Sequence, residues 1–299
     1  MKPFSDHLQN VIQSGEAKVN KNSLHRIAQS VYAGFFIGLA FVFYITVTTG
    51  TKEAHWGVIH LLGGTVFSLG LILVVLFGME LFTSTVLTAV ACVQGRVSVS
   101  RMLVCWAEVY VGNAIGALIL VGLVSGAGLN LVAGGDWGMN VIGVSLHKLH
   151  HTWSQAFFLG MLCNIMVCLG VWLSYMSKQP GTKALLMIMP VALFVSTGFE
   201  HSIANMFMLP LGLVFKDAIP MEFLLAHGYT AETLEALNIS HVIMANIIPV
   251  TLGNIAGGAF FIGLGLLGVE KLSGAQSDVS HATDLNDDDA SQVTAASVD

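Results

Sequence analysis

Two polar interruptions decide the fold of this 299-residue chain, Gly78-Met79-Glu80-Leu81-Phe82-Thr83-Ser84-Thr85 and Gly198-Phe199-Glu200-His201-Ser202-Ile203-Ala204-Asn205. Each lies in an apolar stretch that is too long for one straight bilayer crossing, which needs about 20 residues. Non-helical backbone at membrane depth is tolerated only where protein or a water-filled cavity satisfies its polar groups. We therefore expect two interrupted helices whose breaks meet near the bilayer midplane and mark a pore or binding site.

The composition indicates an integral membrane protein. Hydrophobic residues make up 55% of the chain and charged residues 10%, and the mean hydropathy is positive. Such a chain has too little polar surface to cover a soluble globule. The net charge of -6 does not indicate a nucleic-acid partner, because acidic residues crowd into the segment after Lys271. The only partners that the composition itself indicates are lipids.

Six stretches are long and apolar enough to span a bilayer, and Lys and Arg set their orientation. Nine of the twelve basic residues fall on the side of the two termini, so we expect both termini in the cytoplasm. The spans are residues 28–49, 58–90, 102–125, 153–176, 185–215 and 243–269.

Polar segments flank this membrane-spanning domain, which we place at residues 28–270. In residues 1–27, Phe4, Leu8, Val11 and Ile12 have helical spacing, which favours an amphipathic helix at the cytoplasmic surface. That helix is either an interfacial anchor or a gating element. We see no signal peptide. Residues 271–299 form an acidic tail without apolar periodicity, for which we expect disorder.

Three short motifs recur in order and predict an internal duplication. Gly78 and Gly198 begin the two breaks 120 positions apart, and the motif Gly-Asn at Gly112 recurs 141 positions later at Gly253. An aromatic pair before glycine, Phe35 to Gly38, recurs 122 positions later at Phe157 to Gly160. One insertion around residues 217–240 accounts for the larger separation of the Gly-Asn motifs. Because each half has three spans, the second half has inverted topology.

The breaks contain the ionisable residues of interest, because charges inside a membrane are costly. Glu80 and Glu200 either cap exposed backbone N–H groups or act directly on a solute. His201 is the histidine nearest the midplane and titrates near physiological pH, which favours a functional role. Thr83 is its expected hydrogen-bonding partner, with Ser84 or Thr85 as alternatives. Half-helix N-termini facing the centre favour an anion or an electron-rich polar solute.

Several other groups have competing interpretations. Bulky side chains near the breaks either pack or form hydrophobic constrictions; they are Phe67, Leu71, Leu81, Phe194, Phe199 and Phe207. The cluster from His147 to His151 either binds a metal or forms a positive vestibule, and the incomplete ligand set favours the vestibule. The four cysteines fit packing thiols. We expect no metal and no cofactor.

The segment Gly198 to Met206, GFEHSIANM, resembles the signature of the bacterial formate/nitrite transporter family. The stretches LAFVFYITVTTG from Leu39, LFTSTVL from Leu81 and IPVTLGNIAGG from Ile248 resemble its formate-channel branch. The resemblance covers roughly residues 30–270. It implies an aquaporin-like fold, a homopentamer with one pore per subunit, and the bacterial cytoplasmic (inner) membrane.

The resemblance also implies roles for individual residues. His201 and Thr83 would line the centre of the pore, and Lys148, Asn164 and Asn254 would be polar residues of the vestibule or pore. The constriction positions would be Phe67, Leu71, Leu81 and Phe194.

We therefore expect a pH-dependent, bidirectional formate channel and not an enzyme. A bare carboxylate would cost tens of kcal/mol in a dry constriction, whereas protonating an acid of pKa ~4 at pH 7 costs roughly 4 kcal/mol. Lys148 would attract formate, and His201 with Thr83 would orient it and help a proton reach it. Nitrite or hydrosulfide remain alternative substrates. A haem protein would need histidines at similar depths in the membrane. His60 and His201 are expected at different depths, which argues against haem. We also expect residues 1–27 to close the cytoplasmic mouth at low pH, when His7 and His25 gain charge.

Overall fold

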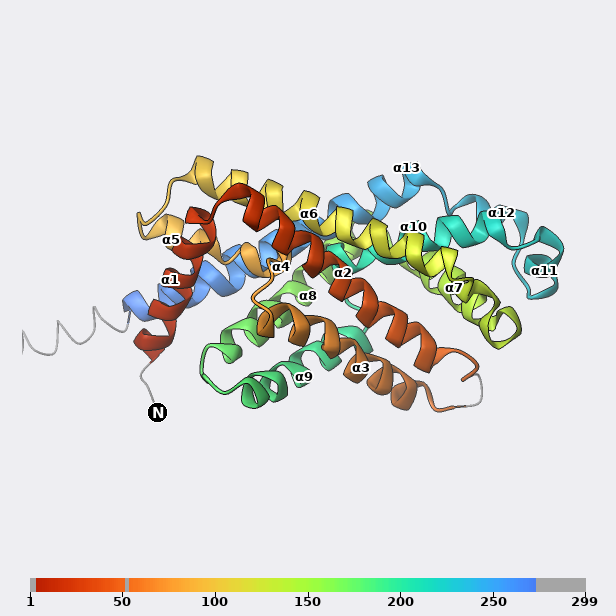
Figure 1. The fold of residues 1–299 in the computed structure, drawn as a ribbon, viewed down its shortest axis with the longest axis horizontal. Helices are drawn as coiled ribbons and strands as arrows, with labels where there is room; N and C mark the ends of the chain where they lie inside the picture. Colours follow the sequence, from red (N-terminus) through yellow and green to blue (C-terminus); the bar gives the residue numbers. More distant parts are fainter. Residues whose placement is uncertain (1–3, 52–53, 273–299) are drawn as a thin grey trace, which may run out of the picture.

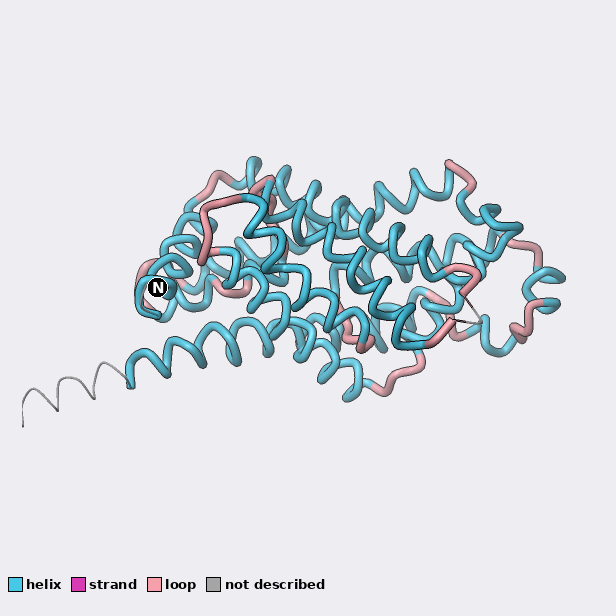
Figure 2. The backbone as a smooth tube through the Cα atoms, turned by 90° about the horizontal axis from the view of Figure 1, so that it is seen from below, coloured by secondary structure: helices cyan, strands magenta, loops and turns pink. Residues whose placement is uncertain are grey.

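The structure is a computed structural model that describes residues 4–51 and 54–272, and in this part every regular element is helical (Figures 1 and 2). The predicted acidic tail lies outside the described residues from position 273 onward. The elements of the first half are α1 (Phe4–Asn20), α2 (Ser23–Thr48), α3 (Trp56–Leu76), α4 (Phe82–Thr85), α5 (Thr88–Val93) and α6 (Val99–Gly126). The elements that follow are η1 (Leu129–Gly135), α7 (Asp136–Leu149), α8 (Trp153–Ser174), α9 (Pro180–Ser196), α10 (Ser202–Ala218), α11 (Met221–Ala226), α12 (Ala231–Glu235), α13 (Ile239–His241), η2 (Val242–Ile247), α14 (Ile248–Ile255) and η3 (Ala256–Leu264).

Five helical segments of the described chain are long and apolar enough to cross a bilayer, compared with the six predicted spans. They are α2, α3, α6, α8 and the continuous run Ile239–Leu272. The difference lies at the predicted span 185–215, which consists of α9 and α10 with non-helical backbone between them. Each of these two helices has 17 residues, which is less than one full crossing. The predicted span 58–90 is likewise divided between α3 and the short helices α4 and α5.

Glycine ends the first helix of each interrupted pair in the same way. Gly78 and Gly198 have φ angles of 66° and 73°, a left-handed conformation that glycine adopts without steric cost. The next amide in each case, of Met79 and of Phe199, donates across the helix end to the carbonyl of the residue five positions earlier. This is the Schellman arrangement, which satisfies the last carbonyls of a helix. The sequence therefore stops α3 and α9 at these positions.

Close glycine contacts fix how the long helices pack. A methyl group placed on Gly116 of α6 would lie 1.8 Å from the carbonyl oxygen of Val31 in α2. One placed on Gly257 of η3 would lie 2.1 Å from the carbonyl oxygen of Met161 in α8. Val31 and Met161 therefore occupy equivalent places, and they lie 130 positions apart.

The predicted equivalence of Phe35–Gly38 with Phe157–Gly160 is wrong. It aligns α2 with α8 at a separation of 122 positions, whereas the glycine contacts align these helices at 130. The error is eight residues, or about two helical turns at 3.6 residues per turn. Close backbone approach at small residues sets the register of membrane helices. An aromatic pair carries less information, since aromatic side chains are common throughout such helices.

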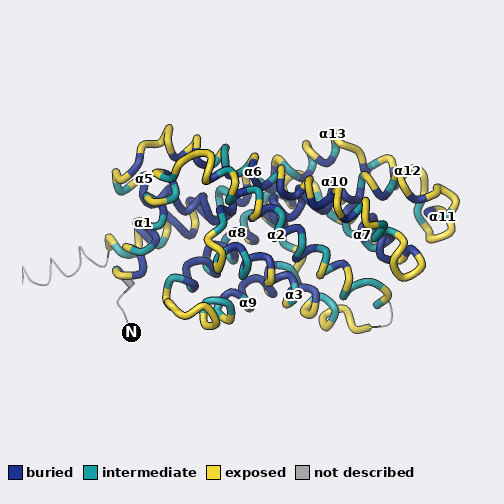
Figure 3. The backbone as a smooth tube through the Cα atoms, viewed as in Figure 1, coloured by how far each residue is buried: buried dark blue, intermediate teal, exposed yellow. Residues whose placement is uncertain are grey.

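Helix α1 packs on the protein rather than lying free at an interface. Leu8, Val11 and Ile12 on its apolar face are buried, and Gly15 approaches Thr88 and Ala91 of α5. Figure 1 shows α1 near one end of the long axis, with α7, α11 and α12 toward the other end. In Figure 3, buried backbone runs through the middle of the helix bundle, and exposed positions lie at the loops and along the outward faces of the helices.

Candidate functional site

The two breaks bring His201 and Thr83 together in the buried centre. His201 Nε2 lies 3.0 Å from Thr83 Oγ1, and both side chains are buried. His201 precedes α10 and Thr83 lies in α4, so each break supplies one member of the pair. The alternative partners Ser84 and Thr85 make no hydrogen bond to His201 in the described structure.

The second nitrogen of His201 fixes the tautomer of the ring. Nδ1 accepts a hydrogen bond from the amide of Ala204 at 3.0 Å, so His201 serves as the N-cap of α10. A nitrogen that accepts this bond carries no proton, and the neutral ring therefore carries its proton on Nε2. Nε2–H donates to Thr83 Oγ1, which leaves the Thr83 hydroxyl proton available for another acceptor. The Thr83 O–H is thus a free donor for a small anion, and the His201 N–H becomes a second donor if it leaves Thr83 Oγ1.

Two asparagines hold the breaks by the same pattern of hydrogen bonds. Asn254 Oδ1 accepts from the Ser202 amide at 2.9 Å, and its Nδ2 donates to the Glu200 carbonyl at 3.0 Å. Asn113 Oδ1 accepts from the Phe82 amide at 2.8 Å, and its Nδ2 donates to the Glu80 carbonyl at 2.9 Å. Both side chains are fully buried. The matching contacts place Leu81 in the position that His201 occupies in the other half.

A third asparagine joins the two halves. Asn164 of α8 donates through Nδ2 to the Thr83 carbonyl at 3.0 Å and to the Asn254 carbonyl at 2.6 Å. The thiol of Cys168, one turn later, lies 3.5 Å from the same Thr83 carbonyl. Asn164 and Asn254 therefore position the loop residues and contact backbone, while the His201–Thr83 pair presents its donors.

The two break glutamates bind lysines and do not cap the breaks. Glu80 accepts from Lys18 and Lys21 of the N-terminal segment. Glu200 accepts from Lys148 of α7 at 3.0 Å. The expectation that these carboxylates cap backbone N–H groups is wrong, because the asparagine side chains already occupy those amides. A charged carboxylate is instead stabilised by a nearby ammonium group.

Aromatic and aliphatic side chains surround the pair. The rings of Phe67 and Phe194 meet edge to face with their centroids 6.1 Å apart, and Phe194 stacks on the His201 ring at 6.0 Å. Leu71 and Leu81 are buried. Phe67 and Phe194 also line a cavity of about 850 Å³, whereas Leu71 and Leu81 do not. Two of the four predicted constriction residues therefore line the cavity, and the other two are buried outside its wall.

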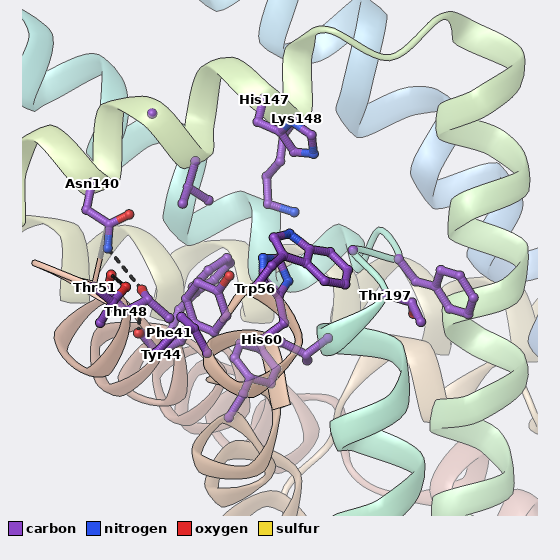
Figure 4. Close-up of a pocket in the computed structure, with 18 of the residues that line it drawn as sticks. Phe41, Tyr44, Thr48, Thr51, Trp56, His60, Asn140, His147, Lys148 and Thr197 are labelled. Carbon is purple, nitrogen blue, oxygen red and sulfur yellow. Dashed lines mark hydrogen bonds between the residues drawn. The ribbon is translucent and has the colours of Figure 1, made fainter. Parts of the chain in front are cut away.

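This cavity, which we call the outer cavity, reaches from His201 to the connections before α3 and after α10. Lys148 extends into it from α7, and its ammonium lies 5.7 Å from the centre of the Phe41 ring (Figure 4). Asn140 closes one side by donating to Thr48 Oγ1 at 2.9 Å. A positive side chain thus faces the approach to His201.

Comparison with known proteins identifies the family. The sequence model described as formate/nitrite transporter matches residues 5–268. The chain belongs to the formate/nitrite transporter family. It is 48% identical to the formate channel FocA of Escherichia coli (strain K12) over 252 residues, which cover 84% of this chain and 88% of that protein. It is 47% identical to the formate channel FocA of Haemophilus influenzae, over 83% of this chain and 87% of that protein.

Solved structures of the formate/nitrite transporter family share the fold. A pentameric formate channel with formate bound has a TM-score of 0.78 and 45% sequence identity, and the match covers 83% of this chain and 97% of that chain. An ion channel of the same family has a TM-score of 0.75 and 26% identity, over 89% of this chain and 99% of that chain. This chain is therefore a multi-pass, all-helical membrane protein whose relatives are channels and transporters.

Other predicted groups of this family member form no ligand set. Within residues 4–51 and 54–272 there is no group of three His, Cys, Asp or Glu side chains placed to hold a metal ion. The rings of His147 and His151 meet edge to face with their centroids 5.3 Å apart, and His151 Nε2 lies 3.9 Å from Glu200 Oε1. Burial lowers the pKa of His151, although the charge of Glu200 opposes the shift. The cysteines are free thiols, and three of the four are buried.

Several residues that hold the site are not identified by the sequence patterns. Lys18 and Lys21 enter those patterns only through their charge, and Asn113 only as part of a repeated Gly-Asn motif. The signal for Lys18 was its position 130 residues before Lys148, the separation that also relates Val31 to Met161. The correct register of α2 and α8 would have pointed to it.

Proposed function

We propose that this protein is a formate channel of the bacterial cytoplasmic membrane. The observation that carries the proposal is the buried hydrogen bond of 3.0 Å between His201 and Thr83, which lies between two broken helices at the end of a cavity lined by Lys148. Formate is a small anion with two acceptor oxygens, so it fits a site made of one O–H and one N–H donor. The relatives named as formate channels support the same substrate.

In this proposal Lys148 draws formate into the outer cavity and the central pair binds it. The ammonium raises the local concentration of small anions at the approach to the pair. Thr83 O–H then donates to one formate oxygen, and His201 Nε2–H can turn from Thr83 to the other. Moving the carboxylate out of water then costs less free energy, because two hydrogen-bond donors contact its oxygens in the dry site.

Protonation of formate at the pair requires a change at His201. The neutral ring holds its proton on Nε2, and transfer of that proton would leave an imidazolate unless Nδ1 gained a proton at the same time. A proton on Nδ1 costs the hydrogen bond from the Ala204 amide. We propose that the ring acts first as a hydrogen-bond donor, and that proton delivery is coupled to loss of this cap.

The test is formate flux through purified protein in liposomes between pH 7.5 and 5. His201→Asn keeps an N-cap and a hydrogen-bonding side chain but cannot titrate. We expect it to lower flux and flatten the pH dependence, and Thr83→Val, which removes only the hydroxyl, to lower flux with the pH dependence retained. Unchanged rate and unchanged pH dependence in His201→Asn would exclude a proton role for the ring.

Nitrite and hydrosulfide are the alternative substrates, because both are small anions that can accept hydrogen bonds from the same donors. The same liposomes loaded in turn with formate, nitrite and hydrosulfide distinguish them. We expect formate to give the largest flux at pH 7, and a larger nitrite or hydrosulfide flux would reassign the substrate.

The architecture that we propose has six spans in two inverted repeats, aquaporin-like, assembled as a homopentamer with cytoplasmic termini. The matched contacts of Asn113 and Asn254 and of Gly116 and Gly257 support the duplication. The pentameric relative supports the assembly. Native mass measurement of the purified protein tests the subunit number.

We also propose that residues 1–27 close the cytoplasmic mouth at low pH. Helix α1 is held by the ion pairs of Lys18 and Lys21 with Glu80. Burial alone would lower the pKa of Lys18, but the Glu80 charge, Tyr175, the hydrogen bond to Glu80 and Cys105 together raise that pKa above its ordinary value, so Lys18 stays charged. His7 lies on the buried face of α1 with Nδ1 unpaired. A proton on His7 would place a charge there and loosen α1.

A further inference from the structure

The outer cavity is far larger than formate needs. Its volume of about 850 Å³ lies within the range of about 300 to 1,000 Å³ that is typical of sites for drug-sized ligands. Formate has three heavy atoms. Much of the cavity therefore lies outside the central pair, and the chemistry of its outer wall decides what else it can bind.

An aromatic platform forms part of that outer wall. Trp56, the first residue of α3, stacks on His60 one turn later, with ring centroids 4.1 Å apart and planes inclined by 29°. Trp56 is 70% exposed and lines the cavity, so one side of its ring is held by His60 while much of it is open to a ligand. Aromatic rings gain from offset stacking beyond the area that they bury.

A cationic donor lies within the same cavity. The ammonium of Lys148 has three N–H donors, and one of them is directed at Glu200 Oε1, 3.0 Å away. Figure 4 shows the Lys148 side chain reaching from α7 toward the part of the cavity where Trp56 and His60 lie. A ligand with a ring at one end and an anionic group at the other can contact the platform and the ammonium together.

The cavity floor excludes a ring from the pore. Phe41 meets Phe67 with centroids 5.4 Å apart, and Phe67 meets Phe194 with centroids 6.1 Å apart. These are ring-to-ring packing distances, which leave no gap of the thickness and width of another ring. An aromatic anion would therefore stay in the outer cavity.

We propose that the outer cavity binds planar aromatic monoanions of the benzoate type, which stack on Trp56 and pair with Lys148, and which block the channel from outside without passing through it. The blocking part rests on the proposed function, whereas the binding part does not. The ligand class follows from the juxtaposition of one exposed ring, one ammonium and a floor of packed rings.

The experiment uses benzenesulfonate, which stays ionised and so does not cross the bilayer as a neutral acid. Formate flux is measured in right-side-out and inside-out membrane vesicles, and binding to purified full-length protein is measured by calorimetry. Cyclohexanesulfonate serves as the non-aromatic anion and benzenesulfonamide as the uncharged ring. The variant is Trp56→Leu. The matched control is Trp153→Leu, since Trp153 is the first residue of α8, is 51% exposed and does not line the cavity.

We expect benzenesulfonate to block flux only in right-side-out vesicles and to block better than either comparison compound. Trp56→Leu should leave flux without blocker unchanged and weaken block and binding about two- to tenfold, the range expected for loss of one aromatic contact. Trp153→Leu should match the unsubstituted protein.

Block that is equal in Trp56→Leu, or that occurs only from the cytoplasmic side, overturns the inference. Formate flux without benzenesulfonate binding also overturns it, while the proposed function stands. If the protein shows no formate flux but binds benzenesulfonate, and Trp56→Leu weakens this binding, the site is supported and the proposed function fails.

Discussion

Variants of the Lys148–Glu200 ion pair distinguish the effect of the cavity's charge on flux from the effect of the ion pair on the stability of the break. Glu200 Oε1 accepts from Lys148 at 3.0 Å, while Oε2 accepts from Asn205 at 2.6 Å and from Asn246 at 3.2 Å. The Glu200 side chain is 1% exposed and that of Lys148 is 11% exposed. We therefore consider the variants Lys148→Met, Glu200→Gln and the double variant.

Each single change leaves one group without its partner. Lys148→Met leaves a buried carboxylate with two amide donors and no countercharge, for which a loss of about 3 kcal/mol is expected, the lower end of the range because Lys148 keeps some contact with solvent. Glu200→Gln can keep its carbonyl toward the two asparagines, but its NH₂ group then faces the ammonium. In the double variant that NH₂ group faces the cavity beside a neutral Met side chain. We expect the double variant to be more stable than Lys148→Met by about 2 kcal/mol.

The assay combines the free energy of unfolding in a detergent denaturation titration with formate flux in liposomes. Stability should recover in the double variant, but flux should remain reduced because the cavity still lacks its ammonium. A double variant no more stable than Lys148→Met would refute the assignment of the ion pair as the partner of Glu200. Full flux in the double variant would refute the role of Lys148 in collecting the anion.

Three further predictions test the packing, the pH response and the N-terminal segment. Gly116→Val should lower the free energy of unfolding by at least about 3 kcal/mol because its side chain would meet backbone of α2, whereas Gly122→Val, where a methyl group meets nothing within 4 Å, should cost little; equal losses would contradict the close approach. Burial keeps the pKa of His151 below its ordinary value of 6.5, so the neutral ring favours the folded state and stability should fall as pH drops below about 6.5; His151→Gln should reduce this slope, and an unchanged slope would assign it elsewhere. A chain that begins at Asn22 should retain formate flux at pH 5 that the full chain loses, and the same loss in both would assign closure to His201 or to formate protonation.

The central pair could be predicted from the sequence because breaks in apolar segments are rare and costly. A polar run such as Gly198 to Asn205 has no place in a lipid-facing helix, so it had to line a shared interior. Once both breaks are central, His201 and Thr83 become neighbours. Their hydrogen bond confirms the expected contact, and their role in transport remains a proposal.

The partners of the glutamates could not be predicted in the same way. A break exposes both amides and carbonyls, and the sequence does not say whether Glu80 or Asn113 satisfies them. The asparagine can do both, since its side chain carries an acceptor and a donor, whereas a carboxylate can only accept. This difference favours asparagine at the backbone and leaves Glu80 and Glu200 free to bind lysines.

The lengths of the two halves differ only in certain places, and these places build the outer cavity. Val31 and Met161 are equivalent at a separation of 130 positions, but Gly78 and Gly198 lie only 120 positions apart, so the first half has ten more residues between its first and second spans. The separation rises to 141 positions at Gly112 and Gly253, so the second half has 21 extra residues before its last span.

Both length differences supply the wall of the outer cavity. The connection between α2 and α3 contributes Thr51 and Ala54, and it leads directly to Trp56. The insertion after α10 contributes His227 and Tyr229, and the Tyr229 hydroxyl donates to the Met139 carbonyl of α7 at 3.2 Å. The contacts of Asn113 and Asn254 that match in the two breaks hold the His201–Thr83 pair. In the proposed channel this core would set the substrate chemistry, whereas the connections of unequal length would set access to the cavity. These connections can therefore change without disturbing the His201–Thr83 hydrogen bond.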